Sequence, residues 1–271
     1  MDSTARKREE NGGDAAMPAL RAVGVRKRYG HVEALRHVDI DVRYGEIVAV
    51  VGDNGAGKST FVKVVAGVHE PDGGDLWLDD ERVAFRSPHD ARKAGIEIVH
   101  QDLALAPDLP VWANLFLGRP RCRGGLLRAF RFLDKRSMRH EAKRQLDRLN
   151  ISLPSVDMPV ENLSGGQRQA IAVARGVAWG RKLILLDEPT NNLGVAEQLE
   201  VLRLVERLAT EGLGVVIVSH NLEHVFRLAH RIVVFRQGRT VASALTRETK
   251  SEQVIGWITG LNGTTTANEE D

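Results

Sequence analysis

Residues 52–60 read GDNGAGKST and fit the phosphate-loop pattern G-x-x-x-x-G-K-[ST]. The apolar run IVAVV at 47–51 predicts a buried strand before it, and the spacing of STFVKVVAGV at 59–68 predicts a helix after it. In this context the backbone N–H groups and the positive end of the helix face the same anion. A plain glycine-rich turn is the alternative, and the flanking strand and helix argue against it.

Each part of this loop has a chemical task if it holds a nucleotide. Gly52, Gly55 and Gly57 allow the backbone to turn tightly around phosphates. Lys58 would reach the β- and γ-phosphates, and Ser59 would hold Mg²⁺. The nucleotide-binding residues expected in this loop are Gly52, Asp53, Asn54, Gly55, Ala56, Gly57, Lys58, Ser59 and Thr60.

An acidic pair ends a second apolar run, LILLDE at 183–188. Asp187 would lie at the carboxyl end of a strand, where ligands bind in parallel sheets, and is the expected partner of Mg²⁺. Glu188 follows it and is a candidate general base for water. Taken alone, such a pair is more often a helix cap or a surface pair. Together with the phosphate loop it indicates phosphoryl transfer.

Composition sets limits on the class of protein. The chain has 271 residues, 42% hydrophobic and 27% charged, as in an ordinary globular protein. A net charge of +2 argues against a dedicated nucleic-acid binder. One cysteine, Cys122, excludes an intrachain disulfide. The longest apolar runs are too short to cross a bilayer, so a membrane role would require a partner.

The pattern of elements predicts an α/β fold. Residues 1–17 and 261–271 are polar and are predicted to be disordered tails around continuous structure at 18–260. Apolar strands on both sides of a helical pattern at 196–212 indicate a parallel sheet with helices on its faces. Residues 103–162 are predicted to be a helical insert, because the stretch from 121 onward is basic and helix-prone.

Two further patterns predict antiparallel strands. RAVGVRKRYG and HVDIDVRYGE, within 21–46, alternate between apolar and polar residues as edge or antiparallel strands do. DLWLDDERV at 75–83 predicts a hairpin that turns at Asp79 and Asp80.

The segment LSGGQRQ at 163–169 resembles the signature of the ABC ATPases. Ser164 can cap the helix that follows, and the glycines let its N–H groups approach an anion. The resemblance implies that Ser164, Gly165, Gly166 and Gln167 contact the γ-phosphate of an ATP held by a second subunit. A glycine-rich helix start without a ligand is the alternative.

Three other positions of the chain match positions of the ABC ATPase family, in the same order. Tyr29 matches the aromatic that stacks on adenine, with a core strand aromatic as the alternative. Gln101 matches the glutamine that contacts Mg²⁺ and senses the transmembrane partner. His220 matches the histidine that contacts the γ-phosphate, whereas His224 and His230 are expected on a helix surface. The resemblance thus implies catalytic roles for Glu188, His220 and Gln101, and metal ligation by Ser59, Gln101 and Asp187.

The resemblance covers residues 18–260 and implies the ABC ATPase fold: a RecA-like parallel sheet, an antiparallel β subdomain and a helical subdomain. VHQDLALAPDLPVWANLFLGR and DEPTNNLGVAE are similar to monosaccharide importers of the ribose, xylose and fructose type with one ATPase domain. That implies ATP and Mg²⁺, a homodimer, transmembrane permease subunits, and indirectly a periplasmic sugar-binding protein, with no nucleic acid. It also implies a peripheral location on the cytoplasmic face of the membrane.

Some features depart from the family or leave alternatives open. Gly194 stands where most members have aspartate, and Asn191 and Asn192 are individual to this chain, which affects cross-subunit coupling. The apolar stretch 101–118 is expected to dock the permease, with burial in the core as the alternative. Rival functions are an exporter ATPase, a non-transport ATPase acting on DNA or ribosomes, and a binding module with weak catalysis.

Overall fold

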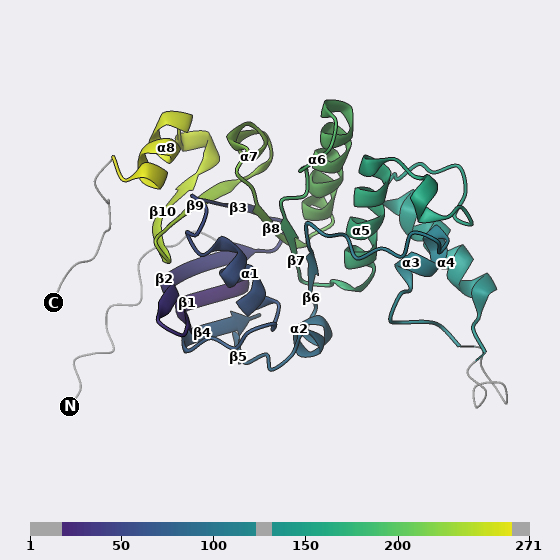
Figure 1. Ribbon diagram of the computed structural model, residues 1–271, viewed down its shortest axis with the longest axis horizontal. Coiled ribbons are helices and arrows are strands. Elements are labelled where there is room, and N and C mark those ends of the chain that lie inside the picture. The colour runs from purple at the N-terminus through teal and green to yellow at the C-terminus, as the bar shows by residue number, and fades with distance from the viewer. Residues whose placement is uncertain (1–17, 123–131, 262–271) are drawn as a thin grey trace.

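A ten-stranded sheet organises the residues that the computed structural model describes, 18–122 and 132–261 (Figure 1). Its strand order is β5-β4-β1-β2-β10-β9-β3-β8-β7-β6. The strands are β1 (Pro18–Tyr29), β2 (Val32–Arg43), β3 (Ile47–Val51), β4 (Gly73–Leu78), β5 (Glu81–Val83), β6 (Ile96–Val99), β7 (Leu183–Asp187), β8 (Gly214–Val218), β9 (Arg231–Arg236) and β10 (Arg239–Leu245).

Helices pack on this sheet (Figure 1). They are α1 (Lys58–Val65), α2 (Pro88–Ala94), α3 (Val111–Leu115), α4 (Lys135–Arg148), α5 (Gly165–Trp179), α6 (Val195–Thr210), α7 (Leu222–Leu228) and α8 (Ser251–Thr259), with 3-10 turns at Val160–Asn162 and Thr246–Glu248. Helices α3, α4 and α5 form a helical region at one end of the molecule (Figure 1). None of the helices in the described ranges is both long and apolar enough to span a bilayer.

The predicted parallel sheet is confirmed in the part that carries the phosphate loop. β3 pairs in parallel with β8 and β9, β8 with β7, and β7 with β6. Every residue of β3 is buried, and its side chains alternate between two hydrophobic clusters. Ala49 packs in the cluster that holds α5 and α6, and Val50 packs in the one that holds α1. Burial on both faces explains why the run IVAVV has no polar residue.

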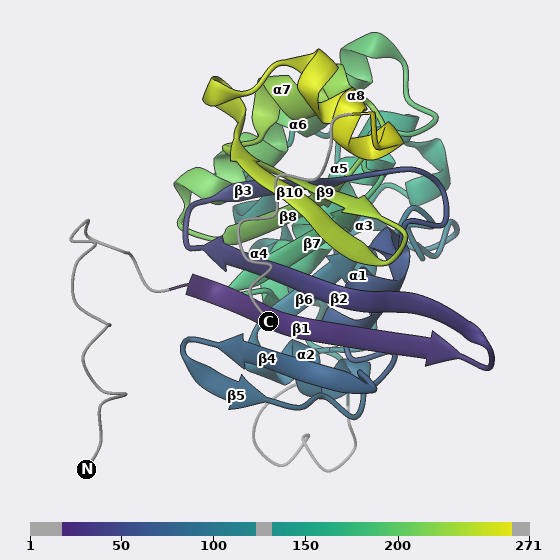
Figure 2. The same cartoon turned by 90° about the vertical axis from the view of Figure 1, so that its left-hand side faces the viewer.

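The predicted antiparallel strands are also confirmed. β1 pairs antiparallel with β2 and with β4, and β4 pairs antiparallel with β5. Figure 2 shows these strands side by side at the edge of the sheet. The hairpin turns at Asp79 and Asp80, both with positive φ (53° and 59°), a conformation that short polar residues tolerate in tight turns.

The insert expected at 103–162 is helical only in part. α3 and α4 lie in it and pack with α5, at the end of the molecule away from β4 and β5 (Figure 1). The expectation of helix from residue 121 is wrong at its start, because Cys122 and Leu133 form an isolated β-bridge and α4 begins only after Asp134. Residues 123–131 and the tails predicted to be disordered lie outside the described residues, apart from Leu261.

A buried amide holds the loop between β6 and α3. Asn114 is fully buried, and its Oδ1 accepts a hydrogen bond from the Ala106 N–H at 2.7 Å. Its Nδ2 donates to the carbonyl oxygens of Ala106 and Leu109, both at 3.0 Å. The Ala106 N–H has this amide as its partner, whereas the two carbonyl oxygens also accept from the Leu109 and Val160 N–H groups.

Replacing Asn114 with alanine is expected to lower the free energy of unfolding by about 1–3 kcal/mol, because the Ala106 N–H loses its partner and the hydrogen bonds of the buried amide to Ala106 and Leu109 are lost. Urea denaturation of the variant measures this change. Asn162→Ala, an exposed position, is the matched control and should change stability by less than about 0.5 kcal/mol. Equal effects of the two substitutions would contradict the role given to Asn114.

Candidate functional site

An open groove of about 840 Å³ lies at the carboxyl ends of β3, β7 and β8. It brings together the whole of the predicted phosphate loop and the four predicted residues from distant parts of the chain. Its lining comprises Val32, Glu33, Ala34, Gly52, Asp53, Asn54, Gly55, Ala56, Gly57, Lys58, Ser59, Thr60, Gln101, Asp187, Glu188, Asn191, Val218 and His220. Parallel strands place their carboxyl ends at one edge, which explains this convergence.

Two glycines of the loop are required by close backbone contacts. Gly52 has φ 149°, and a Cβ there would lie 2.2 Å from the carbonyl oxygen of Phe235 on β9. Gly57 has φ 105°, and its Cβ would lie 2.7 Å from the Ala34 carbonyl oxygen. A side chain at either position would therefore push the loop off the neighbouring strands.

Lys58, the first residue of α1, turns back over the loop. Its Nζ donates hydrogen bonds to the carbonyl oxygens of Gly52 at 2.6 Å and Asp53 at 2.9 Å. Burial lowers the pKa of Lys58, while the charges of Glu188, Asp53 and Asp187 act to raise it. The ammonium group is thus partly desolvated at the centre of the loop, where an additional anion would interact strongly with it.

Asp187 and Glu188 line the same groove from the end of β7. Burial, and then the charge of Glu188, raise the pKa of Asp187 above its usual value. Glu188 adopts the left-handed conformation, φ 51°, which is rare for a residue other than glycine. Its N–H donates to the Val218 carbonyl oxygen at 2.9 Å, which fixes the turn against β8. Strained backbone of this kind is common at functional sites.

Glu188 contacts His220 directly. The Glu188 Oε1 lies 2.9 Å from His220 Nδ1, which joins the ends of two neighbouring strands. The Glu188 side chain is 15% exposed, whereas that of His220 is 66% exposed and faces the opening of the groove. A shielded carboxylate with an accessible imidazole beside it is an arrangement that can orient water and accept its proton.

Tyr29 and the signature residues lie outside the lining of this groove. Tyr29 is 40% exposed and packs edge-on against His69, with ring centroids 5.3 Å apart, so the alternative of a core aromatic is wrong. Ser164 caps α5: its Oγ accepts from the Gln167 N–H, and Gln167 accepts from the Ser164 N–H, as the sequence predicted for the cap.

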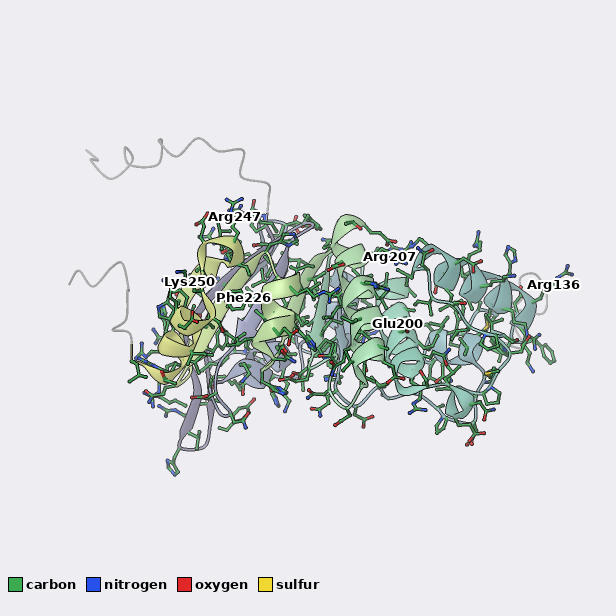
Figure 3. The ribbon with its side chains drawn as sticks, turned by 90° about the horizontal axis from the view of Figure 1, so that it is seen from above. Arg136, Glu200, Arg207, Phe226, Arg247 and Lys250 are labelled. Atoms are coloured by element: carbon green, nitrogen blue, oxygen red, sulfur yellow. The ribbon has the colours of Figure 1, made fainter. Side chains whose placement is uncertain are left out.

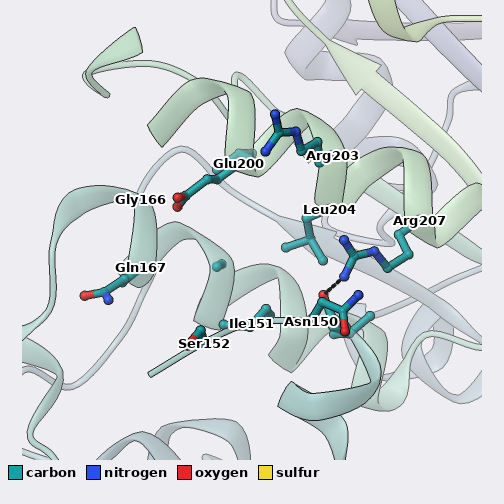
Figure 4. A pocket seen from close by; sticks show the side chains of 12 residues that line it. Asn150, Ile151, Ser152, Gly166, Gln167, Glu200, Arg203, Leu204 and Arg207 are labelled. Atoms are coloured by element: carbon teal, nitrogen blue, oxygen red, sulfur yellow. Dashed lines mark hydrogen bonds between the residues drawn. The ribbon is translucent and has the colours of Figure 1, made fainter. Parts of the chain in front are cut away.

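Gly166 and Gln167 line a second, smaller pocket of about 300 Å³ between the start of α5, the end of α4 and α6. Figure 4 shows α6 presenting Glu200, Arg203, Leu204 and Arg207 to this pocket, and Figure 3 places Glu200 and Arg207 along α6. The signature residues therefore lie outside the groove that the chain's own phosphate loop lines.

The expectation that His224 and His230 lie on a helix surface is wrong for both residues. His224 is buried rather than on a helix surface, and its Nδ1 lies 3.1 Å from the Thr190 Oγ1. His230 is exposed, after the end of α7, and its Nδ1 accepts a hydrogen bond from the Ile47 N–H at 2.9 Å. Sequence reasoning missed the Thr190–His224 pair, because helical spacing alone did not reveal which face of the short α7 helix is covered.

The groove and sheet define a P-loop nucleotide-binding domain, and the comparisons with known proteins identify its family. The family model described as ABC transporter matches residues 35–191. This chain belongs to the ABC transporter family and is an ATP-binding ATPase of that family. The fold class predicted from the resemblance is therefore confirmed.

Similar proteins include two of about the same length. The chain is 47% identical over 237 residues to the xylose/arabinose import ATP-binding protein XylG of Sulfolobus acidocaldarius, covering 88% of this chain and 92% of that protein. It is 44% identical over 248 residues to the fructose import ATP-binding protein FrcA of Rhizobium meliloti, covering 91% and 95%. The dimeric structure of MJ0796, a bacterial ABC transporter cassette, has the same fold, with a TM-score of 0.69, 24% identity and coverage of 84% of this chain and 99% of that one.

Replacing Lys58 with alanine is expected to weaken ATP binding by about 10- to 100-fold, because one charge-assisted phosphate contact is worth about 1.5–3 kcal/mol. Equilibrium dialysis with ATP and Mg²⁺ measures the dissociation constant. Lys93→Ala, an exposed lysine on α2, is the control and should bind like the parent. Unchanged ATP affinity in the Lys58 variant would remove this lysine from the site.

Proposed function

We propose that residues 18–260 form one nucleotide-binding domain that hydrolyses ATP to power the import of a monosaccharide through a membrane permease. The observation that carries the proposal is the pairing of Glu188 with His220 in the groove that Lys58 also lines. The names of XylG and FrcA support import of a sugar. Since those names differ in the sugar, the proposal extends only to the class.

ATP would lie along the phosphate loop. Lys58 and the loop N–H groups would hold the β- and γ-phosphates, and Tyr29 would stack on adenine at the exposed end of β1. Ser59, Gln101 and Asp187 all line the groove and offer a hydroxyl, an amide and a carboxylate oxygen, the donors that Mg²⁺ prefers. When bound with ATP, Mg²⁺ would neutralise phosphate charge, and it would favour the ionised form of Asp187.

Glu188 and His220 would then carry out hydrolysis in the same groove. Glu188 would accept a proton as a water oxygen attacks the γ-phosphorus, the bond to the β-phosphate oxygen breaks, and ADP and phosphate leave. His220 would hold the γ-phosphate and the water in place, since its imidazole is open to the groove and already contacts Glu188. Gln101 would contact Mg²⁺ in the groove and begins the segment 101–118, so it would link ATP hydrolysis to the surface that docks the permease.

The signature residues would act on the ATP of a second copy of this chain. Ser164, Gly165, Gly166 and Gln167 start a capped helix, and none of them lines the chain's own groove. A head-to-tail dimer would bring each signature loop to the other copy's γ-phosphate, where the positive end of α5 favours an anion. MJ0796, an ABC cassette with this fold, forms a dimer.

The permease would dock on residues 101–118, and a periplasmic sugar-binding protein would deliver the sugar to it. Leu109 and Leu117 in this segment are 39% and 45% exposed. The core alternative holds for Val111, Trp112, Leu115 and Phe116, which are buried, while Leu103 and Leu105 are partly buried against the same core. Arg175 of α5 donates to the carbonyl oxygens of Leu103 and Ala104 at 2.7 and 2.8 Å, so the signature helix contacts the docking segment. A subunit held by the permease in this way would lie peripherally, on the cytoplasmic face of the membrane.

Replacing Glu188 with glutamine is expected to lower ATP turnover by about 10²- to 10⁴-fold while ATP still binds, because glutamine cannot accept the proton of water. Phosphate release and sedimentation of the same sample with ATP and Mg²⁺ measure turnover and dimer formation, and the variant should persist as a dimer. Glu223→Gln, exposed on α7, is the control. Near-parental turnover in the Glu188 variant would show that Glu188 is not the base.

Cysteines placed at Ala104 or Leu109, with Cys122 replaced by serine, are expected to cross-link to the permease in the assembled complex. A cysteine at Glu248, on the exposed turn near α8, should remain unlinked. The measurement is the appearance of a cross-linked band in the nucleotide-free, ATP and ADP states. An intact complex with no cross-link from either position in any state would exclude this docking surface.

A further inference from the structure

The start of α6 touches the signature loop through one carboxylate, that of Glu197. Its Oε1 accepts a hydrogen bond from the Gly166 N–H at 3.0 Å, and its Oε2 accepts one from the Gly194 N–H at 3.2 Å. The two N–H groups belong to the signature helix and to the loop that follows the acidic pair. Glu197 therefore joins two segments that are separate in the sequence.

The contact is close as well as polar. A Cβ on Gly166 would lie 2.8 Å from the Cβ of Glu197 and 3.4 Å from its Cα, so the first turn of α6 packs directly on the signature backbone. The Gly166 N–H, and then the hydroxyl of Ser164 and the Gly194 N–H, hold the pKa of Glu197 below its usual value. The carboxylate is thus held in its ionised form by the loop that it supports.

Glu197 also caps its own helix. In a helix start, a Ser, Thr, Asp or Asn at the cap normally supplies one hydrogen bond and the glutamate three residues later returns another. Gly194 has no side chain, so Glu197 provides the side-chain half of this cap with one carboxylate oxygen, while its other oxygen accepts from Gly166.

We propose that Glu197 is a positioning residue that holds the signature loop in the conformation in which it receives the γ-phosphate of the opposite copy. This inference rests on the proposed function, because it assumes that the signature acts across a dimer. Glu197 would not touch ATP in its own groove, whose lining it does not join. Its loss should leave ATP binding by the single subunit intact and weaken only the closure of two copies.

Glu200 offers a matched control. It has the same charge, lies one turn further along α6 and lines the pocket beside Gly166 (Figure 4). Unlike Glu197, it takes part in no ion pair or side-chain hydrogen bond within the described ranges. If negative charge near the start of α5 is what matters, substitution of either residue should have an effect. If the hydrogen bonds to the signature loop are what matter, only substitution of Glu197 should have one.

The first readout is amide hydrogen exchange of Gly166, measured by NMR in the subunit without nucleotide. Glu197→Gln leaves one acceptor oxygen where the carboxylate used two, and Glu197→Ala removes both. Exchange at Gly166 should rise about tenfold or more in Glu197→Ala, by a smaller factor in Glu197→Gln, and not at all in Glu200→Gln or Glu200→Ala. Thermal unfolding of each variant checks that the fold is intact. Unchanged Gly166 exchange in both Glu197 variants would overturn the inference, whatever the function.

The second readout is the dissociation constant of the dimer formed with ATP and Mg²⁺ on the Glu188→Gln background, measured by sedimentation velocity. Adding Glu197→Gln should raise this constant about tenfold or more, with ATP affinity of the monomer unchanged, and adding Glu200→Gln should leave it as it is. An unchanged constant, or an equal rise with Glu200→Gln, would refute the role of Glu197. Absence of any ATP-dependent dimer in the Glu188→Gln parent would instead refute the proposed function, and Gly166 exchange would still decide whether Glu197 holds the loop.

Discussion

Close packing of the phosphate loop against two neighbouring strands is the constraint on which the site depends. Gly52 passes so near the Phe235 carbonyl oxygen that no side chain fits, and Lys58 closes the loop from above through the Gly52 and Asp53 carbonyl oxygens. β3 lies between β8 and β9 in the sheet, so the loop emerges beside the strand end that carries His220. The next strand, β7, delivers Asp187 and Glu188 to the same edge.

The charges at this edge are arranged for an anionic ligand with a bound cation. Lys58 and Asp187 both have pKa values shifted toward their neutral forms, chiefly by burial. A polyphosphate and its metal ion would offset both desolvation costs at once, since each partially buried charge would gain an opposite neighbour. Glu188 gains its orientation from strained backbone and a contact with His220, so its position is set before a ligand arrives.

Features encoded by local sequence could be predicted, and features created by contact between distant segments could not. The phosphate loop, the hairpin at Asp79 and Asp80 and the cap at Ser164 depend on glycine, turn and capping chemistry within a few residues. Gln101 and His220 were assigned from the family resemblance, and their convergence with Asp187 and Glu188 fits parallel strands that end at one edge. Burial of His224 and the support of Gly166 by Glu197 depend on how helices pack. Of the contact between Glu197 and Gly166, only the three-residue spacing from Gly194 to Glu197, a capping pattern, is visible in the sequence.

The central claim is that two copies of this chain share each ATP, with Lys58 of one copy and the signature of the other on the same γ-phosphate. A crystal structure of the Glu188→Gln variant with ATP and Mg²⁺ tests it most directly. The account predicts that the γ-phosphate oxygens lie within hydrogen-bond distance of the Lys58 Nζ in one copy and of the Gly165 N–H in its partner, since the Gly166 N–H and the Ser164 hydroxyl already donate to Glu197. A γ-phosphate held by Lys58 with no signature loop from a second copy against it would contradict the account.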